Sequence, residues 1–244
     1  MNQHRYDAIA KALGATNATP ELTSRLWRGL YAHWSEQHRH YHGVNHLERV
    51  LNTLDMYRRL YNGPLPKISA NRPWVAADLA EFALLYHDAV YSAHAARGDN
   101  EKNSAELAAQ DARALGIPLC AISYVIRSIL ATDYHDAIAG RVRIQDYAEC
   151  SVIYIVWGCD LAPLADSLAV FREDTENVWK EYDPPTPAME CRRAEFLYGI
   201  SAFEPFRQIP VDGSNWFRQF ETPMRRNVLS AMLDALRKAQ VALS

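Results

Sequence analysis

The chain has 244 residues and a formal net charge of −3, from 26 Lys and Arg against 29 Asp and Glu. Hydrophobic residues make up 49% and charged residues 23%, which excludes a disordered chain and supplies enough apolar surface for a core. The slightly acidic balance argues against duplex nucleic acid as a partner, because a phosphate backbone requires a basic surface.

The sequence contains no predicted membrane span or export signal. The longest stretch without Asp, Glu, Lys or Arg is residues 114–126, which is too short to cross a bilayer and contains Pro118. The N-terminal residues lack the apolar core of a secretion signal. The 4 cysteines form no CxxC pair and are expected to be reduced. These features predict a soluble cytoplasmic protein with no membrane partner.

Helical patterns extend along the chain, and no alternating strand pattern or internal repeat is visible. Pro20, Pro73 and Pro223 each stand at a plausible first helical position, with Thr19 and Thr222 as N-caps. Proline-bearing connectors occupy residues 62–73 and 183–187, and the composition is similar on either side of each. We therefore predict one all-α domain over residues 1–244, with helices at about 20–36, 44–61, 73–91, 99–115, 118–132, 144–158, 164–182, 188–201 and 223–242.

Two predicted helices, 73–91 and 144–158, are apolar on nearly every face and should be central. Charged residues at their ends are therefore informative, because a buried carboxylate must be paired, protonated or metal-bound. His87 and Asp88 end the first of these runs, Asp160 follows the second, and His46 borders an apolar stripe in 44–61. These four side chains could converge on a divalent cation. The alternative is hydrogen-bonded core histidines and aspartates that cap helices or turns.

Several short segments in a fixed order strengthen the metal hypothesis. The chain has YHGVNH at 41–46, YHDAVY at 86–91, NEKNSA at 100–105 and TDYH at 132–135. Asp160-Leu161 follows an apolar helix, and Glu181-Tyr182 precedes an arginine at 192 or 193. The set resembles the HD-domain superfamily of metal-dependent phosphohydrolases. More narrowly, it is similar to a bacterial family of predicted HD-type phosphohydrolases of about this length.

The resemblance implies an HD-domain helical bundle with one divalent ion held by His46, His87, Asp88 and Asp160. The ion would be Mn, Fe, Mg, Ni or Zn, and a second metal is possible. The metal-binding core would span about 40–165, with the helices of about 166–244 packed on it. Many HD hydrolases carry an acidic residue soon after the His-Asp pair, where this chain has Tyr91 and Ser92.

Further roles are assigned to polar residues near these segments. Candidate catalytic residues are Asp88, Glu101 and His135. Candidate substrate-binding residues are His42, Tyr91, Lys102 and Arg193. Alternatives are a favourable charge at a helix N-terminus for Glu101 and solvated surface positions for His135, Lys102 and Arg193. His38 and His40 are expected to be solvated.

The predicted function is metal-dependent hydrolysis of a small phosphorylated molecule, such as a nucleotide, by activated water. One alternative is a di-iron oxygenase-like HD protein, for which His42, Glu101 and His135 would be additional ligands. The other is a non-catalytic HD module that binds a nucleotide or a metal. Both alternatives keep the all-α fold.

Overall fold

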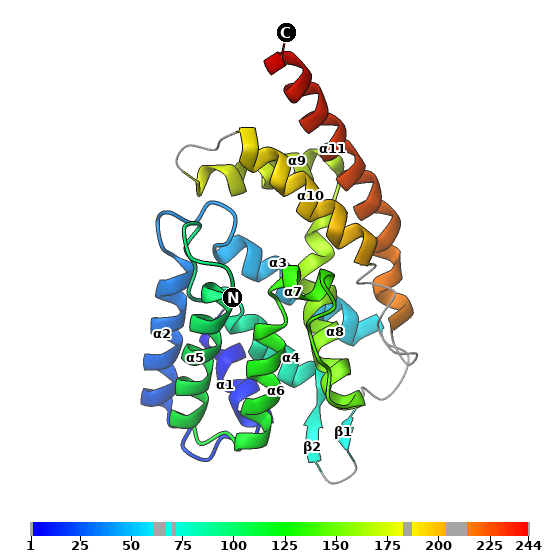
Figure 1. Ribbon diagram of the computed structural model, residues 1–244. Helices are drawn as coiled ribbons and strands as arrows, with labels where there is room; N and C mark the ends of the chain where they lie inside the picture. Colours follow the sequence, from blue (N-terminus) through cyan, green and yellow to red (C-terminus); the bar gives the residue numbers. More distant parts are fainter. Residues whose placement is uncertain (1, 61–66, 70–71, 183–186, 204–213, 244) are drawn as a thin grey trace.

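The computed structural model of the chain describes residues 2–60, 67–69, 72–182, 187–203 and 214–243. Over this part the fold is all-α, as predicted (Figure 1). The helices are α1 (Gln3–Ala12), α2 (Pro20–Trp34), α3 (Val44–Leu60), α4 (Ala76–Tyr86), α5 (Asp99–Ala114), α6 (Leu119–Leu130), α7 (Tyr134–Ile138), α8 (Tyr147–Leu161), α9 (Leu168–Lys180), α10 (Pro187–Phe203) and α11 (Glu221–Leu243), with 3-10 helices η1 (Ala162–Ala165) and η2 (Ser214–Phe220).

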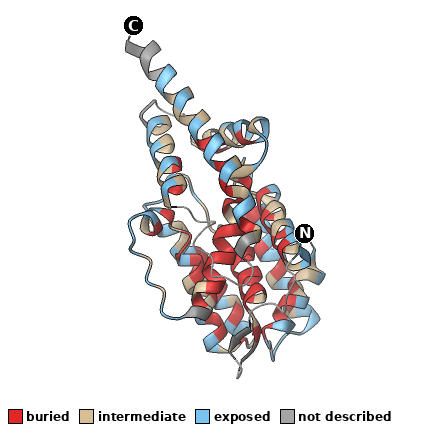
Figure 2. Cartoon of the chain, turned by 90° about the vertical axis from the view of Figure 1, so that its right-hand side faces the viewer, coloured by how far each residue is buried: buried red, intermediate tan, exposed pale blue. Residues whose placement is uncertain are grey.

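Helix α4 is the centre of the molecule. Every residue from Leu79 to Tyr86 is buried, including Glu81, and the helix packs against α3, α6 and α8. Figure 2 shows the buried residues gathered in the middle of the helical body. This confirms the prediction that the apolar run before His87 lies in the core, since a helix apolar on all faces must be enclosed.

A short antiparallel hairpin precedes α4, although no strand was predicted. Strands β1 (Lys67–Ser69) and β2 (Arg72–Val75) pair with Lys67 opposite Val75 and Ser69 opposite Arg72. Pro73 therefore lies in β2 and does not begin a helix. Proline is tolerated there because, in a two-stranded sheet, each strand has an outer edge whose backbone N–H groups donate to no neighbouring strand. Most of the predicted connectors 62–73 and 183–187 falls outside the described residues.

Helix ends follow the predicted caps in part. The Thr19 side chain accepts from the backbone N–H of Leu22 at 3.3 Å, which confirms this N-cap. Thr222 is not a cap, because η2 continues directly into α11 at Glu221 and the helix is already formed there. The short helices α1 and α7 were not predicted, and α4 ends at Tyr86, five residues earlier than expected.

The C-terminal helices lie across one end of the body and α11 extends beyond it (Figure 1). Helix α10 contacts α7, and α11 contacts η1. The 4 cysteines are free. No single helix in the described ranges is long and apolar enough to cross a membrane, and one bent pair, 149–165 with 168–180 at 106°, passes on length and composition only when taken together.

Candidate metal centre

The His87-Asp88 pair stands directly after the last turn of α4. His87 is 1% exposed, and its Nδ1 lies 2.8 Å from the carbonyl oxygen of Leu84. A carbonyl oxygen can only accept, so Nδ1 carries the hydrogen in this contact. Nε2 is then the atom that faces the neighbouring polar side chains, as in many metal-binding histidines.

Three other side chains meet His87 from separate parts of the chain. His46, in the first turn of α3, has its Nε2 3.3 Å from Nε2 of His87. Oδ1 of Asp160, near the end of α8, lies 3.1 Å from Nε2 of His46 and 3.3 Å from Nε2 of His87. Oδ2 of Asp88 lies 3.3 Å from Nε2 of His87 and 3.9 Å from Nε2 of His46. The fold thus brings all four predicted ligands together.

The spacing suits a divalent ion. Bonds from zinc to histidine nitrogen and carboxylate oxygen are about 2.0–2.2 Å, so neighbouring ligand atoms lie roughly 3.0–3.4 Å apart in tetrahedral or octahedral geometry. The separations among His46, His87 and Asp160 fall in this range. Imidazole nitrogen with carboxylate oxygen is also a donor set that borderline divalent ions favour. His46, His87 and Asp160 therefore form a cluster that could hold a metal ion.

Burial and the close carboxylates set the charges of the cluster. Burial lowers the pKa of His46. It would also lower the pKa of His87, but the carboxylates of Asp88 and Asp160 outweigh it and raise that pKa to about 9. Burial would raise the pKa of Asp160, whereas the neighbouring His87 and His46 hold it well below its ordinary value. Asp160 is thus ionised at neutral pH.

Tyr134 fixes the second oxygen of Asp160. Its hydroxyl donates to Oδ2 at 2.6 Å, so Oδ1 is left to face the two histidines. Tyr134 opens α7 and is buried. A catalytic role was predicted for its neighbour His135 but none for Tyr134, although the TDYH segment contains both. The only feature of the sequence that pointed to Tyr134 was its place in the TDYH segment.

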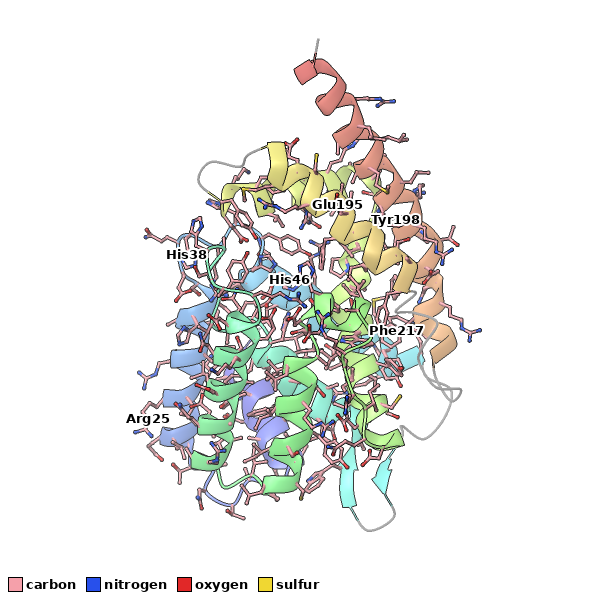
Figure 3. The ribbon with its side chains drawn as sticks, viewed as in Figure 1. Arg25, His38, His46, Glu195, Tyr198 and Phe217 are labelled. Atoms are coloured by element: carbon pink, nitrogen blue, oxygen red, sulfur yellow. The ribbon has the colours of Figure 1, made fainter. Side chains whose placement is uncertain are left out.

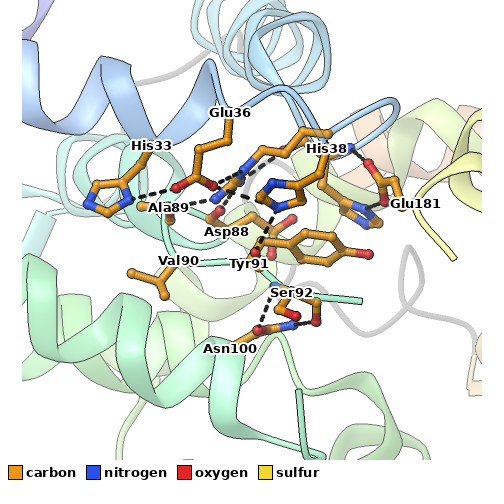
Figure 4. A network of polar contacts seen from close by, with 12 residues as sticks. His33, Glu36, His38, Asp88, Ala89, Val90, Tyr91, Ser92, Asn100 and Glu181 are labelled. Atoms are coloured by element: carbon orange, nitrogen blue, oxygen red, sulfur yellow. Dashed lines mark hydrogen bonds and ion pairs between the residues drawn. The ribbon is translucent and has the colours of Figure 1, made fainter. Parts of the chain in front are cut away.

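Arg39 joins the loop before α3 to the segment after α4 that carries Asp88. Figure 4 shows Glu36, Asp88 and Ala89 in one network of polar contacts. Its side chain is fully buried and donates to the carbonyl oxygens of His42, Asp88 and Ala89 at 3.0, 2.6 and 2.8 Å. Glu36 balances its charge at 2.9 Å. The flanking His38 and His40 are exposed, as predicted, but Arg39 between them holds the Asp88 backbone in place.

Glu181, just after α9, binds the loop that leads into α3. One oxygen, Oε1, accepts from the backbone N–H groups of His40, Tyr41 and His42 at 2.9, 2.7 and 2.9 Å. The other oxygen lies 2.7 Å from Nδ1 of His42. Burial would raise the pKa of Glu181, but these hydrogen bonds lower it to about 2. His42 is therefore oriented by a buried carboxylate from the C-terminal half of the chain.

A pocket of about 490 Å³ opens over the cluster. It lies between helix α3, which carries His46, and helix α10, which carries Glu195 and Tyr198 (Figure 3). The predicted residues that line it are His42, His46, Asp88, Tyr91, Glu101, His135, Asp160 and Arg193. His87 is buried and Lys102 is exposed on α5, and neither lines the pocket. The structure thus separates Lys102 from the other predicted substrate-binding residues.

The pocket walls combine acidic and aromatic groups. Glu101, in the first turn of α5, is half-buried, and burial together with the charges of Asp88 and Asp133 raises its pKa to about 7. The Tyr91 ring stacks on His42 with centroids 4.2 Å apart, and the His135 ring lies 4.8 Å from that of Phe196. The walls therefore offer both titratable groups and flat apolar surfaces to a ligand.

The fold and the cluster define the chain as an all-α protein with a candidate metal centre beneath a pocket. Comparison with protein-family models gave no match, and neither did comparison with curated proteins.

Proposed function

We propose that this chain is an HD-type, metal-dependent phosphohydrolase that acts on a small phosphorylated molecule. The observation that carries the proposal is the convergence of His46, His87, Asp88 and Asp160 beside a pocket of about 490 Å³. Pockets that enclose small ligands are usually about 300–1,000 Å³. The order of sequence segments that resembles HD phosphohydrolases supports the same class.

A divalent ion held by these four residues would polarise a phosphoryl oxygen and lower the pKa of a bound water. The chain would supply the proton transfers. Glu101 lines the pocket with a pKa raised to about 7, so its carboxyl can accept and release a proton near neutral pH. Asp88 would orient the attacking water from its position beside the cluster.

His42 is the proposed contact to the leaving side of the substrate. Its Nδ1 is engaged by Glu181, so Nε2 is the ring atom available to a ligand. A carboxylate partner fixes the tautomer and the ring orientation of an imidazole. With Nδ1–H held by Glu181, Nε2 of the neutral imidazole would accept a hydrogen bond, whereas the imidazolium would donate one from Nε2 to a substrate oxygen. His135 and Arg193 would be further contacts on the pocket wall.

One metal is proposed, in preference to a di-iron centre. Among the described residues, one group of three or more His, Cys, Asp and Glu side chains converges on a common point, and it is the group of His46, His87 and Asp160. His42, Glu101 and His135 line the pocket but do not join that group.

Metal analysis by mass spectrometry tests the proposal first. We expect about one tightly held transition metal per chain in the wild type and in the exposed-site control His4→Ala. We expect less than a tenth of that in His87→Ala and Asp88→Ala, with helix content retained in circular dichroism. The ion found then defines the conditions for a screen of phosphate esters and nucleotides.

Three outcomes would contradict the proposal. If the protein held no metal after reconstitution with Mn²⁺, Fe²⁺ or Ni²⁺, the proposed metal centre would be wrong. Two irons per chain with oxygen consumption would favour the di-iron alternative. Tight nucleotide binding with no product under any metal would indicate a non-catalytic binding module.

A further inference from the structure

Arg193 differs from the other enclosed arginines of the molecule. Its Nε is fully buried and has no hydrogen-bond partner, and no carboxylate pairs with its guanidinium within the described ranges. Elsewhere, partly or fully buried arginines each hold a carboxylate; these are Arg5, Arg39, Arg49, Arg58 and Arg127. An unpaired cation at such a place is costly, so its presence needs an explanation.

No described carboxylate forms an ion pair with Arg193, although Glu176, Glu190 and Asp234 line a second cavity that Arg193 also borders. The guanidinium lies 5.9 Å from the centre of the Trp179 ring, and Tyr182 and Phe196 line the same pocket. Asp174, an acidic group whose charge reaches Arg193, is itself bound to Arg49 at 2.9 Å. Aromatic rings favour a guanidinium through their faces but leave most of its five N–H donors unused.

The charges of the pocket are segregated by wall. One wall is acidic and is formed by the end of α4, α5, the N-cap of α7 and α8, which carry Asp88, Glu101, Asp133 and Asp160. The opposite wall is formed by α10, which carries Arg192 and Arg193. The acidic wall would repel an anionic ligand unless a bound metal ion neutralised its charge. It would be attracted by the α10 wall with or without the metal.

We propose that Arg193 is an anion-binding subsite that takes a phosphate group of the pocket ligand. A guanidinium matches two oxygens of a phosphate in a planar, bidentate contact, which would use the donors that the protein leaves unpaired. The identification of the anion as phosphate rests on the proposed function, whereas the existence of an anion subsite rests on Arg193 and its wall alone. The subsite would place the ligand across the pocket, between α10 and the acidic residues.

Calorimetric titration of the metal-free, full-length protein tests this subsite. Inorganic phosphate and pyrophosphate are the probes, and acetate separates phosphate from carboxylate binding. We expect the wild type to bind pyrophosphate more tightly than acetate and Arg193→Met to lose at least tenfold in affinity. The affinity of Arg193→Lys should fall between those of the wild type and Arg193→Met, because lysine keeps the positive charge but cannot make the planar, bidentate contact. Arg25→Met, an exposed arginine on α2, should match the wild type.

Thermal unfolding gives a second, independent readout. Without phosphate, Arg193→Met should unfold at the same or a higher temperature than the wild type, because it removes a half-buried cation whose Nε is buried and has no hydrogen-bond partner. Added pyrophosphate should raise the unfolding temperature of the wild type only. If Arg193→Met is destabilised without phosphate, or binds pyrophosphate as the wild type does, the subsite is wrong.

The outcome is separable from that of the proposed function. Asp88→Ala should keep pyrophosphate binding while it loses metal. A wild type that binds metal but no anion would overturn the subsite and leave the metal centre. A wild type that binds the anion but no metal would support the subsite and overturn the metal centre.

Discussion

At the scale of single residues, the orientation of Asp160 depends on one hydroxyl. Tyr134 donates to Oδ2 at 2.6 Å while Oδ1 faces His46 and His87. Tyr134→Phe removes that donor and nothing else, so the carboxylate gains rotational freedom. Because partners of metal ligands typically contribute 10–100-fold to affinity, we predict metal binding weaker by about that factor. Competition with a chromogenic chelator measures it.

The matched control is Tyr198→Phe, which changes an exposed hydroxyl on α10. It should bind metal as the wild type does. Equal affinity in Tyr134→Phe would mean that the histidines alone orient Asp160.

Glu181 gives a prediction for pH. Its pKa is lowered from 4.5 to about 2 by His42 and three backbone N–H groups. A lowered carboxyl pKa adds stability that is complete above the unfolded-state pKa and is lost as the pH falls through the native one. The shift corresponds to about 3 kcal/mol. We predict that Glu181→Gln is less stable by about this amount at pH 7, and that the gap narrows as the pH falls from 4.5 toward 2.

Urea unfolding of both proteins between pH 7 and pH 3 measures the gap. Glu195→Gln, on the exposed side of α10, should change stability by less than about 0.5 kcal/mol at every pH. A constant gap for Glu181→Gln would mean that its hydrogen bonds do not favour the ionised form.

The sequence located the ligand residues but not those that orient them. His46, His87, Asp88 and Asp160 stand out because charged groups beside apolar runs need neutralisation, and the structure brings them together. Arg39, Tyr134 and Glu181 act through partners that are distant in the chain; His40 and Glu181, for example, are 141 positions apart. No local pattern marks such a partner, because the fold alone brings the two together.

At the scale of elements, replacing each of two helical glycines by alanine is predicted to change stability in opposite directions. A Cβ on Gly158 in α8 would lie 2.5 Å from the ring of Phe217, which is fully buried. A Cβ on Gly29 in α2 would meet nothing within 4 Å. We predict that Gly158→Ala destabilises the protein by about 1–3 kcal/mol through overpacking. Gly29→Ala should stabilise it by about 0.4–1 kcal/mol, because alanine restricts the unfolded chain.

Denaturant unfolding of the two variants beside the wild type measures both effects. If Gly158→Ala were as stable as the wild type, Phe217 would have to move at little cost and η2 would not be closely packed on α8.

Strongly patterned elements were predictable, whereas short ones were not. The apolar runs that became α4 and α8 are core helices, and Thr19 caps α2. Helix α1 was missed because it lacks a long apolar stripe, yet Tyr6 in it is fully buried and its hydroxyl lies 2.8 Å from that of Tyr86. The hairpin of β1 and β2 is stabilised by pairing between its own strands, which no helical pattern could reveal.

At the scale of the whole molecule, metal binding and unfolding are linked. The cluster draws on α3, the end of α4 and α8, so it exists only when these elements are assembled. A metal at 100 times its Kd would add about 2.7 kcal/mol to the free energy of unfolding. For a chain of this size we predict that chelation lowers the Tm by roughly 5–10 °C. Asp88→Ala should show no such change in differential scanning calorimetry, and an equal Tm with and without chelator in the wild type would contradict the linkage.

The bonds from Glu181 to the loop before α3 also set an order of events during synthesis. They connect residues 139 to 141 positions apart, so the loop cannot be fixed when it first leaves the ribosome. At about 5–20 residues per second, Glu181 emerges roughly 7–28 seconds after its partners. Contacts of such long range form late, because closing the intervening chain costs entropy before any bond repays it. The nascent chain therefore carries His46, His87 and Asp160 before His42 is held in place, and the pocket is completed only by the last third of the sequence.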